Sequence, residues 1–208
     1  MDDHIRRSNL LYRFIRVMGH AYFHPLYALK LEGRGNIPAH DPAIICPKHQ
    51  FWTDIPIVGL AAARPLSFIA KQELFTHPVI RHFLTAMGGI PMDRQKPLKS
   101  LNSFRYVEKL LRRGESIVLF PEGTYFPHSM GDGKHRFIQL ILRLQEKMGW
   151  EGSKRIPFVP LGIQYGSGKL RREVRVNIGE PLYAQGEAEG VEFTRRIMGA
   201  IASLSGLN

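Results

Sequence analysis

Short apolar runs alternate along the chain with longer stretches in which apolar residues recur every three or four positions. The short runs predict buried strands at residues 43–46, 66–70, 89–92, 116–120, 158–164 and 174–178. The helical spacing predicts helices at residues 54–63, 73–86, 100–113, 136–148 and 190–204. Because strands alternate with helices, the pattern predicts an α/β fold: a single domain with a mostly parallel, mixed sheet flanked by helices.

The N-terminal region has a different pattern. Residues 8–31 predict one or two amphipathic helical pieces, which Pro25 breaks or kinks. Basic side chains on or beside the polar flank, mixed with aromatic rings, suit the headgroup region of a membrane. The same pattern also suits a helix packed on the domain's own core. We therefore divide the chain into an amphipathic membrane-interface segment, residues 1–30, and one domain, residues 31–208.

Charge narrows the choice of partners. The 208 residues include 29 Lys and Arg against 18 Asp and Glu, a net charge of +11. This imbalance indicates an anionic partner, and nucleic acid, an anionic lipid surface, a phosphorylated substrate and an acidic carrier protein all satisfy it.

Cysteine content and hydropathy indicate the compartment. The single cysteine, Cys46, excludes an internal disulfide framework and a zinc site built from cysteines, and it favours a reducing cytosol. No apolar run reaches the roughly 18–20 residues that span a bilayer, and the acidic start of the chain is unlike a signal peptide. We therefore expect a cytoplasmic protein that is neither secreted nor transmembrane.

The first candidate for chemistry is His49, which follows the strand at residues 43–46, with Asp54 five positions later across a strand-to-helix turn. A carboxylate there can reach one ring nitrogen, fix the tautomer and stabilise the cation, so that the other nitrogen acts as a base. Asp54 also suits the N-cap of a helix that has Pro56 just inside it. The two roles are compatible, and the spacing alone does not establish either.

Two further motifs lie on predicted strands. Residues 88–94 place two glycines before a strand that ends at Arg94, whose guanidinium suits a phosphate and equally suits a surface turn. Residues 159–162 place Pro160 inside a strand, which predicts an edge strand or a bulge because proline has no N–H to donate.

A third motif, residues 120–124, ends in Glu122, Gly123 and Thr124 at the carboxyl end of an apolar strand. Its backbone amides can form an anion-binding nest, or the motif can be an ordinary turn. In open α/β sheets, functional loops gather at the carboxyl ends of parallel strands. We therefore expect this turn to share one crevice with the candidate base and the candidate phosphate cation.

Together these motifs resemble the glycerolipid acyltransferase family, which includes 1-acylglycerol-3-phosphate acyltransferases. That family has a His-x4-Asp motif, a Gly-rich strand that ends in Arg, a Phe-Pro-Glu-Gly-Thr motif and a Val-Pro segment, in that order. In this chain they are residues 49–54, 88–94, 120–124 and 159–162, so the resemblance covers most of the sequence. Lys71 stands where the family often has a Lys before its second motif.

The resemblance implies transfer of a fatty acyl group from acyl-CoA or acyl carrier protein to the free hydroxyl of 1-acyl-glycerol-3-phosphate, which makes phosphatidic acid. It implies that His49 is the general base and Asp54 its orienter, with no metal and no cofactor besides the acyl thioester co-substrate. The residues that it implies for substrate binding are Lys71, Arg94, Glu122, Gly123, Thr124 and Pro160. A covalent acyl-enzyme is not implied, and Cys46 is expected to be a buried structural thiol.

Two departures from the family pattern leave the acceptor open. The family often has Arg directly after Glu-Gly-Thr, where this chain has Tyr125, and a base among residues 134–136 could replace it. Lys48 and Phe51 also replace residues that are more usual in the first motif. The same chemistry on glycerol 3-phosphate, another lysophospholipid or another lyso-lipid is therefore an alternative.

Two rival classes explain less of the sequence. A basic nucleic-acid-binding module leaves the His-Asp and Glu-Gly-Thr motifs without a function. A His-based metal hydrolase lacks a ligand motif such as HExxH. Acyl-CoA, carrier proteins, lysophosphatidate and anionic bilayers all suit the positive charge. We therefore expect no nucleic-acid partner and a peripheral position on the inner face of the cell membrane.

Overall fold

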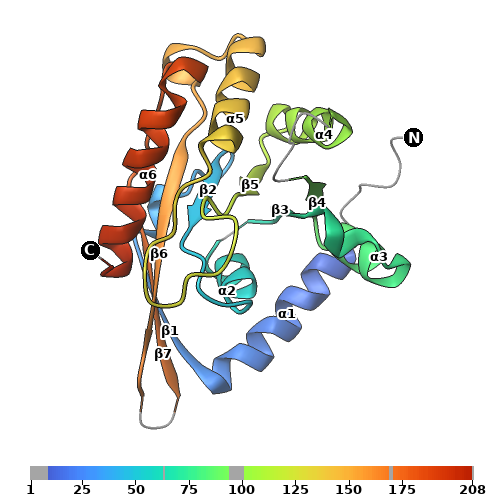
Figure 1. Ribbon diagram of the computed structural model, residues 1–208. Helices are drawn as coiled ribbons and strands as arrows, with labels where there is room; N and C mark the ends of the chain where they lie inside the picture. Colours follow the sequence, from blue (N-terminus) through green and yellow to red (C-terminus); the bar gives the residue numbers. More distant parts are fainter. Residues whose placement is uncertain (1–8, 63, 94–100, 169–170, 208) are drawn as a thin grey trace.

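The computed structural model describes residues 9–62, 64–93, 101–168 and 171–207, which form one seven-stranded sheet with helices on both faces (Figure 1). The strands are β1 (Tyr27–Glu32), β2 (Ile44–Pro47), β3 (Leu66–Lys71), β4 (Gly89–Met92), β5 (Ser116–Val118), β6 (Phe158–Gly166) and β7 (Arg172–Ile178). The α-helices are α1 (Asn9–Leu26), α2 (Asp54–Ala61), α3 (Pro78–Ala86), α4 (Leu101–Arg112), α5 (His135–Lys147) and α6 (Gly190–Ser205). Short 3-10 helices are η1 (Arg34–Asn36), η2 (Gln72–Phe75), η4 (Gly152–Lys154) and η5 (Glu187–Glu189).

The strand order is β1-β7-β6-β2-β5-β3-β4. The strands from β6 to β4 run parallel to one another, whereas β7 is antiparallel to β6 and β1 is parallel to β7. The predicted α/β fold with a mostly parallel, mixed sheet is therefore confirmed. Because parallel strands have their carboxyl ends at one edge, the segments that follow β2, β3, β4 and β5 all start there.

Alternate residues of the central strands enter two cores, one on each face of the sheet. Ile44 and Cys46 of β2 pack with side chains of α4, α5 and α6, whereas Ile45 packs with α2 and with Phe23 of α1. Figure 1 shows α6 and α1 on opposite sides of the long strands β6 and β7. Burial on both faces explains why the central strands read as continuous apolar runs in the sequence.

The N-terminal region differs in part from its prediction. α1 ends one residue after Pro25, and residues 27–32 form β1 beside β7 instead of continuing a helical segment to residue 31. β1 is an edge strand with half-buried or exposed side chains, so its apolar pattern is weaker than that of the central strands. It also spans the expected boundary at residue 30. Within the described part of the chain, no helix is both long and apolar enough to cross a bilayer.

The helix expected at residues 73–86 forms as two elements, η2 and α3. His77, between them, has an extended backbone with φ −81° and ψ 127°. This is the conformation that a residue before proline prefers, and Pro78 then begins α3 in the position where a helix tolerates proline best.

Pro160 lies inside the sheet, because β6 is paired with β2 on one side and with β7 on the other. The edge-strand expectation is therefore wrong. On the β7 side the register shifts by one residue between the pair Leu161–Ile178 and the bridge Phe158–Leu182. This shift is a β-bulge beside Pro160, where a missing N–H is tolerated.

Candidate active site

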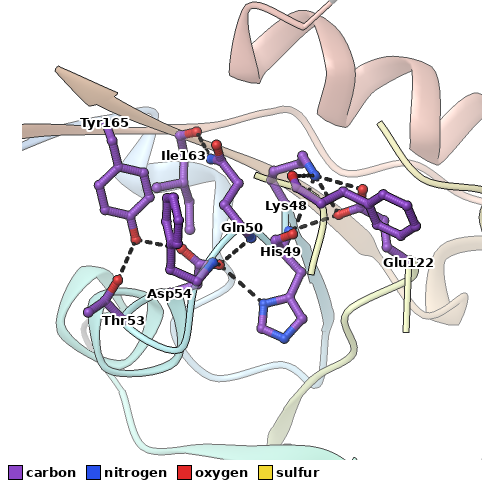
Figure 2. Close-up of polar contacts among 10 residues, drawn as sticks. Lys48, His49, Gln50, Thr53, Asp54, Glu122, Ile163 and Tyr165 are labelled. Atoms are coloured by element: carbon purple, nitrogen blue, oxygen red, sulfur yellow. Dashed lines mark hydrogen bonds and ion pairs between the residues drawn. The ribbon is translucent and has the colours of Figure 1, made fainter. Parts of the chain in front are cut away.

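His49 lies two residues beyond β2 and Asp54 begins α2, so the turn between the two elements brings their side chains together. His49 Nδ1 is 3.1 Å from Asp54 Oδ2 (Figure 2). An ionised carboxylate only accepts hydrogen bonds, so Nδ1 is the donor, and in the neutral ring Nε2 then carries the lone pair. Both residues are buried. The pair therefore has the geometry of a base with an orienting carboxylate.

The Asp54 carboxylate also fixes the turn that carries His49. Its Oδ2 accepts hydrogen bonds from the backbone N–H of Gln50 at 2.5 Å and of Phe51 at 2.7 Å. Both amides precede the helix, and Thr53 occupies the N-cap position without a side-chain cap bond. The expectation that Asp54 caps the helix is therefore wrong, because its bonds go back into the turn.

Tyr165, near the end of β6, supplies a further donor to this carboxylate. Its hydroxyl donates to Asp54 Oδ1 at 2.5 Å and lies 2.9 Å from Thr53 Oγ1 (Figure 2). Burial, and then the negative charge of Asp54, raises the pKa of the Tyr165 phenol well above its ordinary value. The phenol therefore stays protonated and remains a donor. Gln50 anchors the same turn to β6, because its Nε2 donates to the Ile163 carbonyl at 2.6 Å.

A fully buried ion pair lies on the other side of the turn. Lys48 Nζ is 2.7 and 2.9 Å from the two Glu122 oxygens, and neither side chain is exposed. Glu122 also accepts from the backbone N–H of His49 and of Gly131, each at 2.8 Å. Lys48 donates to the Phe126 carbonyl at 2.9 Å. The pair therefore ties the turn after β2 to the connection between β5 and α5.

Two aromatic rings from that connection enclose the imidazole. The Phe120 ring stacks on His49 with centroids 3.9 Å apart, and the Tyr125 ring is tilted against it at 4.3 Å. Between them Gly123 has a left-handed backbone with φ 72°, which favours glycine at this position. Tyr125, at the place where the family often has Arg, is thus held directly against the candidate base.

The structure brings three of the predicted site residues into one network: His49, Asp54 and Glu122. Gly123 and Thr124 continue the same turn, with Thr124 exposed. Glu122 uses both of its oxygens on protein groups, so its visible contacts order the site rather than project into open space.

The remaining predicted site residues are Lys71, Pro160 and Arg94. Lys71 is exposed at the end of β3 and pairs with Glu73 at 3.6 Å. Pro160 is buried in β6 opposite Cys46. Cys46 itself is fully buried, as expected, and burial raises the pKa of its thiol. Arg94 lies outside the described residues.

The sequence interpretation missed two contributors, Lys48 and Tyr165. In the sequence, Lys48 stands out only as a departure from the usual motif. The available signal was its place directly after a buried strand, because a lysine that is buried needs a carboxylate partner. Tyr165 gave no such signal, since it lies 111 positions from Asp54 in the chain.

Fold and site define a class of protein: an α/β domain with a carboxylate-oriented histidine at the carboxyl edge of its parallel strands. The sequence model of one family, described as Acyltransferase, matches residues 28–164, and the chain belongs to that family. The match includes both members of the His-Asp pair and Glu122.

Individual relatives agree with this assignment. The chloroplastic 1-acyl-sn-glycerol-3-phosphate acyltransferase LPAT1 of Arabidopsis thaliana is 33% identical over 102 residues, which are 49% of this chain and 28% of that protein. A lyso-ornithine lipid O-acyltransferase of Pseudomonas aeruginosa is 34% identical over 99 residues, 47% of this chain and 37% of that protein. The matched part therefore spans less than half of either relative.

The fold itself has been seen before. The crystal structure of the 1-acyl-sn-glycerophosphate (LPA) acyltransferase PlsC from Thermotoga maritima superposes with a TM-score of 0.63. The superposition covers 93% of this chain and 79% of that one at 23% sequence identity. At this identity the likeness concerns the fold.

Proposed function

We propose that the protein transfers a fatty acyl group from acyl-CoA or acyl carrier protein to the free hydroxyl of 1-acyl-glycerol-3-phosphate, which yields phosphatidic acid. The observation that carries this proposal is the 3.1 Å contact between His49 Nδ1 and Asp54 Oδ2 in a chain of the Acyltransferase family. Two of the similar proteins named above carry the corresponding activity in their names.

The reaction follows from the free Nε2 of His49. This nitrogen takes the proton of the acceptor hydroxyl while the hydroxyl oxygen attacks the thioester carbonyl. Asp54 stabilises the imidazolium that forms. The tetrahedral intermediate then collapses, its carbon–sulfur bond breaks, and the thiolate leaves with the proton that the imidazolium returns. The products are the ester and the free thiol, and the base is regenerated.

The acceptor phosphate needs cationic and amide groups near this base. We assign its binding to Arg94 and to the turn at Gly123 and Thr124, with Glu122 holding the turn in place. Lys71, exposed at the end of β3, would attract the phosphate, and Pro160 would act through the position of β6 beside β2. These assignments take the roles from the family motif and give them to the residues of this chain that match it.

The test is incubation of the purified protein with labelled acyl-CoA and a panel of lyso-lipids, with mass detection of the products. We expect phosphatidic acid from wild type and none from His49→Ala. His40→Ala, an exposed histidine in the loop before β2, serves as the matched control and should keep full turnover. Near-normal turnover of a folded His49→Ala protein would remove the mechanism.

A second acceptor is favoured by one observation. Tyr125, which packs on His49, places an aromatic ring where the family often has a phosphate-binding Arg. A lyso-ornithine lipid carries an amino-acid headgroup without a phosphate, and a similar protein of Pseudomonas aeruginosa is named for acylating it. This lipid therefore belongs in the acceptor panel beside lysophosphatidate, and the preferred product decides between the two.

The acceptor is a membrane lipid in either case, so we place the protein on the inner face of the cell membrane. The N-terminal residues 1–30 would provide attachment, because α1 exposes Phe14, Val17, Met18 and Tyr22. Since β1 begins at Tyr27, point substitutions on α1 test this attachment more cleanly than deletion of the segment.

A further inference from the structure

The segment after β3, residues 72–86, exposes more apolar surface than its packing explains. It comprises η2 and α3, and four of its large apolar side chains are between 48% and 71% exposed: Leu74, Val79, Ile80 and Phe83. Within α3 the one buried residue is Ala86, its last residue. A helix of this kind contributes little to the core, and exposed apolar clusters usually mark an interaction surface.

The apolar residues of α3 share one face. Val79 and Phe83 are four positions apart and Ile80 and Phe83 are three apart, so their side chains are neighbours on the helix surface. Arg81 is exposed on the same helix, with His82 beside it. Successive residues are about 100° apart around a helix, so Arg81 lies on the polar face, roughly opposite Val79 and Phe83. An apolar face with a cation on the opposite, polar face is typical of a helix that lies in the interface of an anionic bilayer.

The segment lies at the edge of the sheet that carries the candidate base. β3 is parallel to β5 and β5 to β2, so the carboxyl ends of β2 and β3 are at the same edge. At this edge His49 follows β2, and residues 72–86 follow β3. The exposed Trp52 lies in the turn at the same edge. Figure 1 shows α3 beyond β3 and β4, on the flank away from α6.

We propose that residues 72–86 dock on an anionic lipid bilayer, with Leu74, Val79, Ile80 and Phe83 in the headgroup region and Arg81 at the lipid phosphates. The proposal rests on the proposed function, since a lipid acceptor must reach His49 from a membrane. A bilayer can bury the apolar side chains and bind the cation through its lipid phosphates at the same time. Docking then turns the carboxyl edge of the sheet toward the lipid layer that holds the acceptor. This surface belongs to elements other than α1.

The test is co-sedimentation of the full chain with vesicles of phosphatidylcholine and phosphatidylglycerol. Val79→Ser combined with Phe83→Ser should lower vesicle binding about tenfold or more, because both side chains lose apolar burial in the bilayer. Val191→Ser makes the same valine-to-serine change at a 47% exposed site on α6 and should bind like wild type. Unchanged thermal unfolding of each variant checks that the fold is intact.

The charge is tested on the same vesicles. Arg81→Glu should weaken binding to vesicles that contain phosphatidylglycerol several-fold, and added salt should remove this difference because salt screens exposed charges. Arg195→Glu on α6 is the control and should have no such effect. Wild-type binding by the Val79→Ser/Phe83→Ser protein would overturn the proposal. The proposal would also be overturned if the wild-type protein did not bind vesicles and this segment instead bound an acidic carrier protein.

A parallel activity assay separates this proposal from the proposed function. With a short-chain lysophosphatidate that is soluble in water, the Val79→Ser/Phe83→Ser protein should turn over like wild type, whereas turnover of vesicle-embedded acceptor should fall with binding. If wild type transfers no acyl group to either acceptor but the variant still loses vesicle binding, the proposed function fails and the docking surface stands.

Discussion

Four donors converge on the Asp54 carboxylate, and they come from two distant parts of the chain. Three belong to the turn itself: the His49 ring and the N–H groups of Gln50 and Phe51. The fourth is the Tyr165 hydroxyl from β6. Groups of the turn therefore fix the position of Asp54 Oδ2, and the Tyr165 hydroxyl of β6 fixes the position of Oδ1. Tyr165 is a positioning residue in this arrangement, because it acts on the base through Asp54.

Replacing this phenol tests the positioning role. Tyr165→Phe removes one hydrogen bond to a charged group, which is worth about 1.5–3 kcal/mol, and should lower kcat about tenfold or more. KM for the acceptor should change little, because the hydroxyl is engaged by Asp54 and Thr53. Steady-state kinetics on folded protein measure both, with the exposed Tyr183→Phe as control. A raised KM with normal kcat would contradict the role.

Replacing Tyr125 tests the choice between the two proposed acceptors. Tyr125→Arg replaces a ring at 4.3 Å from His49 with a guanidinium that binds phosphate through charge-assisted hydrogen bonds. We expect the ratio of kcat/KM for lysophosphatidate over lyso-ornithine lipid to rise about tenfold. Competition between the two acceptors, read by mass, gives this ratio directly. An unchanged ratio would mean that the side chain does not reach the headgroup.

At the scale of elements, the buried Lys48–Glu122 pair joins β2 to the β5–α5 connection. Removing either partner leaves a buried charge, so Lys48→Met and Glu122→Gln should each lower the free energy of unfolding by about 3–5 kcal/mol. The double variant should lose less than the sum, because it leaves no unpaired charge. Urea unfolding of all four proteins completes the cycle. Additive losses would show that the two side chains are not coupled.

The elements that the sequence predicted well are those with a strong local pattern. Runs such as residues 43–46 and 116–120 are buried throughout, so composition alone marks them as strands. β1 was missed because an edge strand at this end of the sheet leaves its side chains half-buried or exposed. For Pro160 the sequence left two alternatives, an edge strand or a bulge, and the choice of the bulge depends on the register near Ile178. The His-Asp contact was within reach because both residues belong to one turn.

At the scale of the molecule, what the sequence could not provide is the lateral order of the strands. β2 has β6 and β5 as neighbours, although both follow it by more than fifty residues. That order alone brings Tyr165 and Glu122 to opposite sides of the turn after β2. The family motif indicated that its parts meet, but the contacts between them follow from the sheet.

Cys46 reports on unfolding at the centre of the sheet. It is fully buried in β2 and packs in the core formed with α4, α5 and α6. Burial raises the pKa of this thiol far above its ordinary value, so the folded protein has no reactive thiolate at pH 8. Alkylation should therefore require unfolding of the sheet, and labelling should be about 10³-fold or more slower than in the unfolded chain. The rate, measured by mass at rising urea concentrations, should increase in parallel with global unfolding, while Val191→Cys provides a thiol that reacts at once. Fast labelling of native Cys46 at low urea would contradict its burial in the sheet.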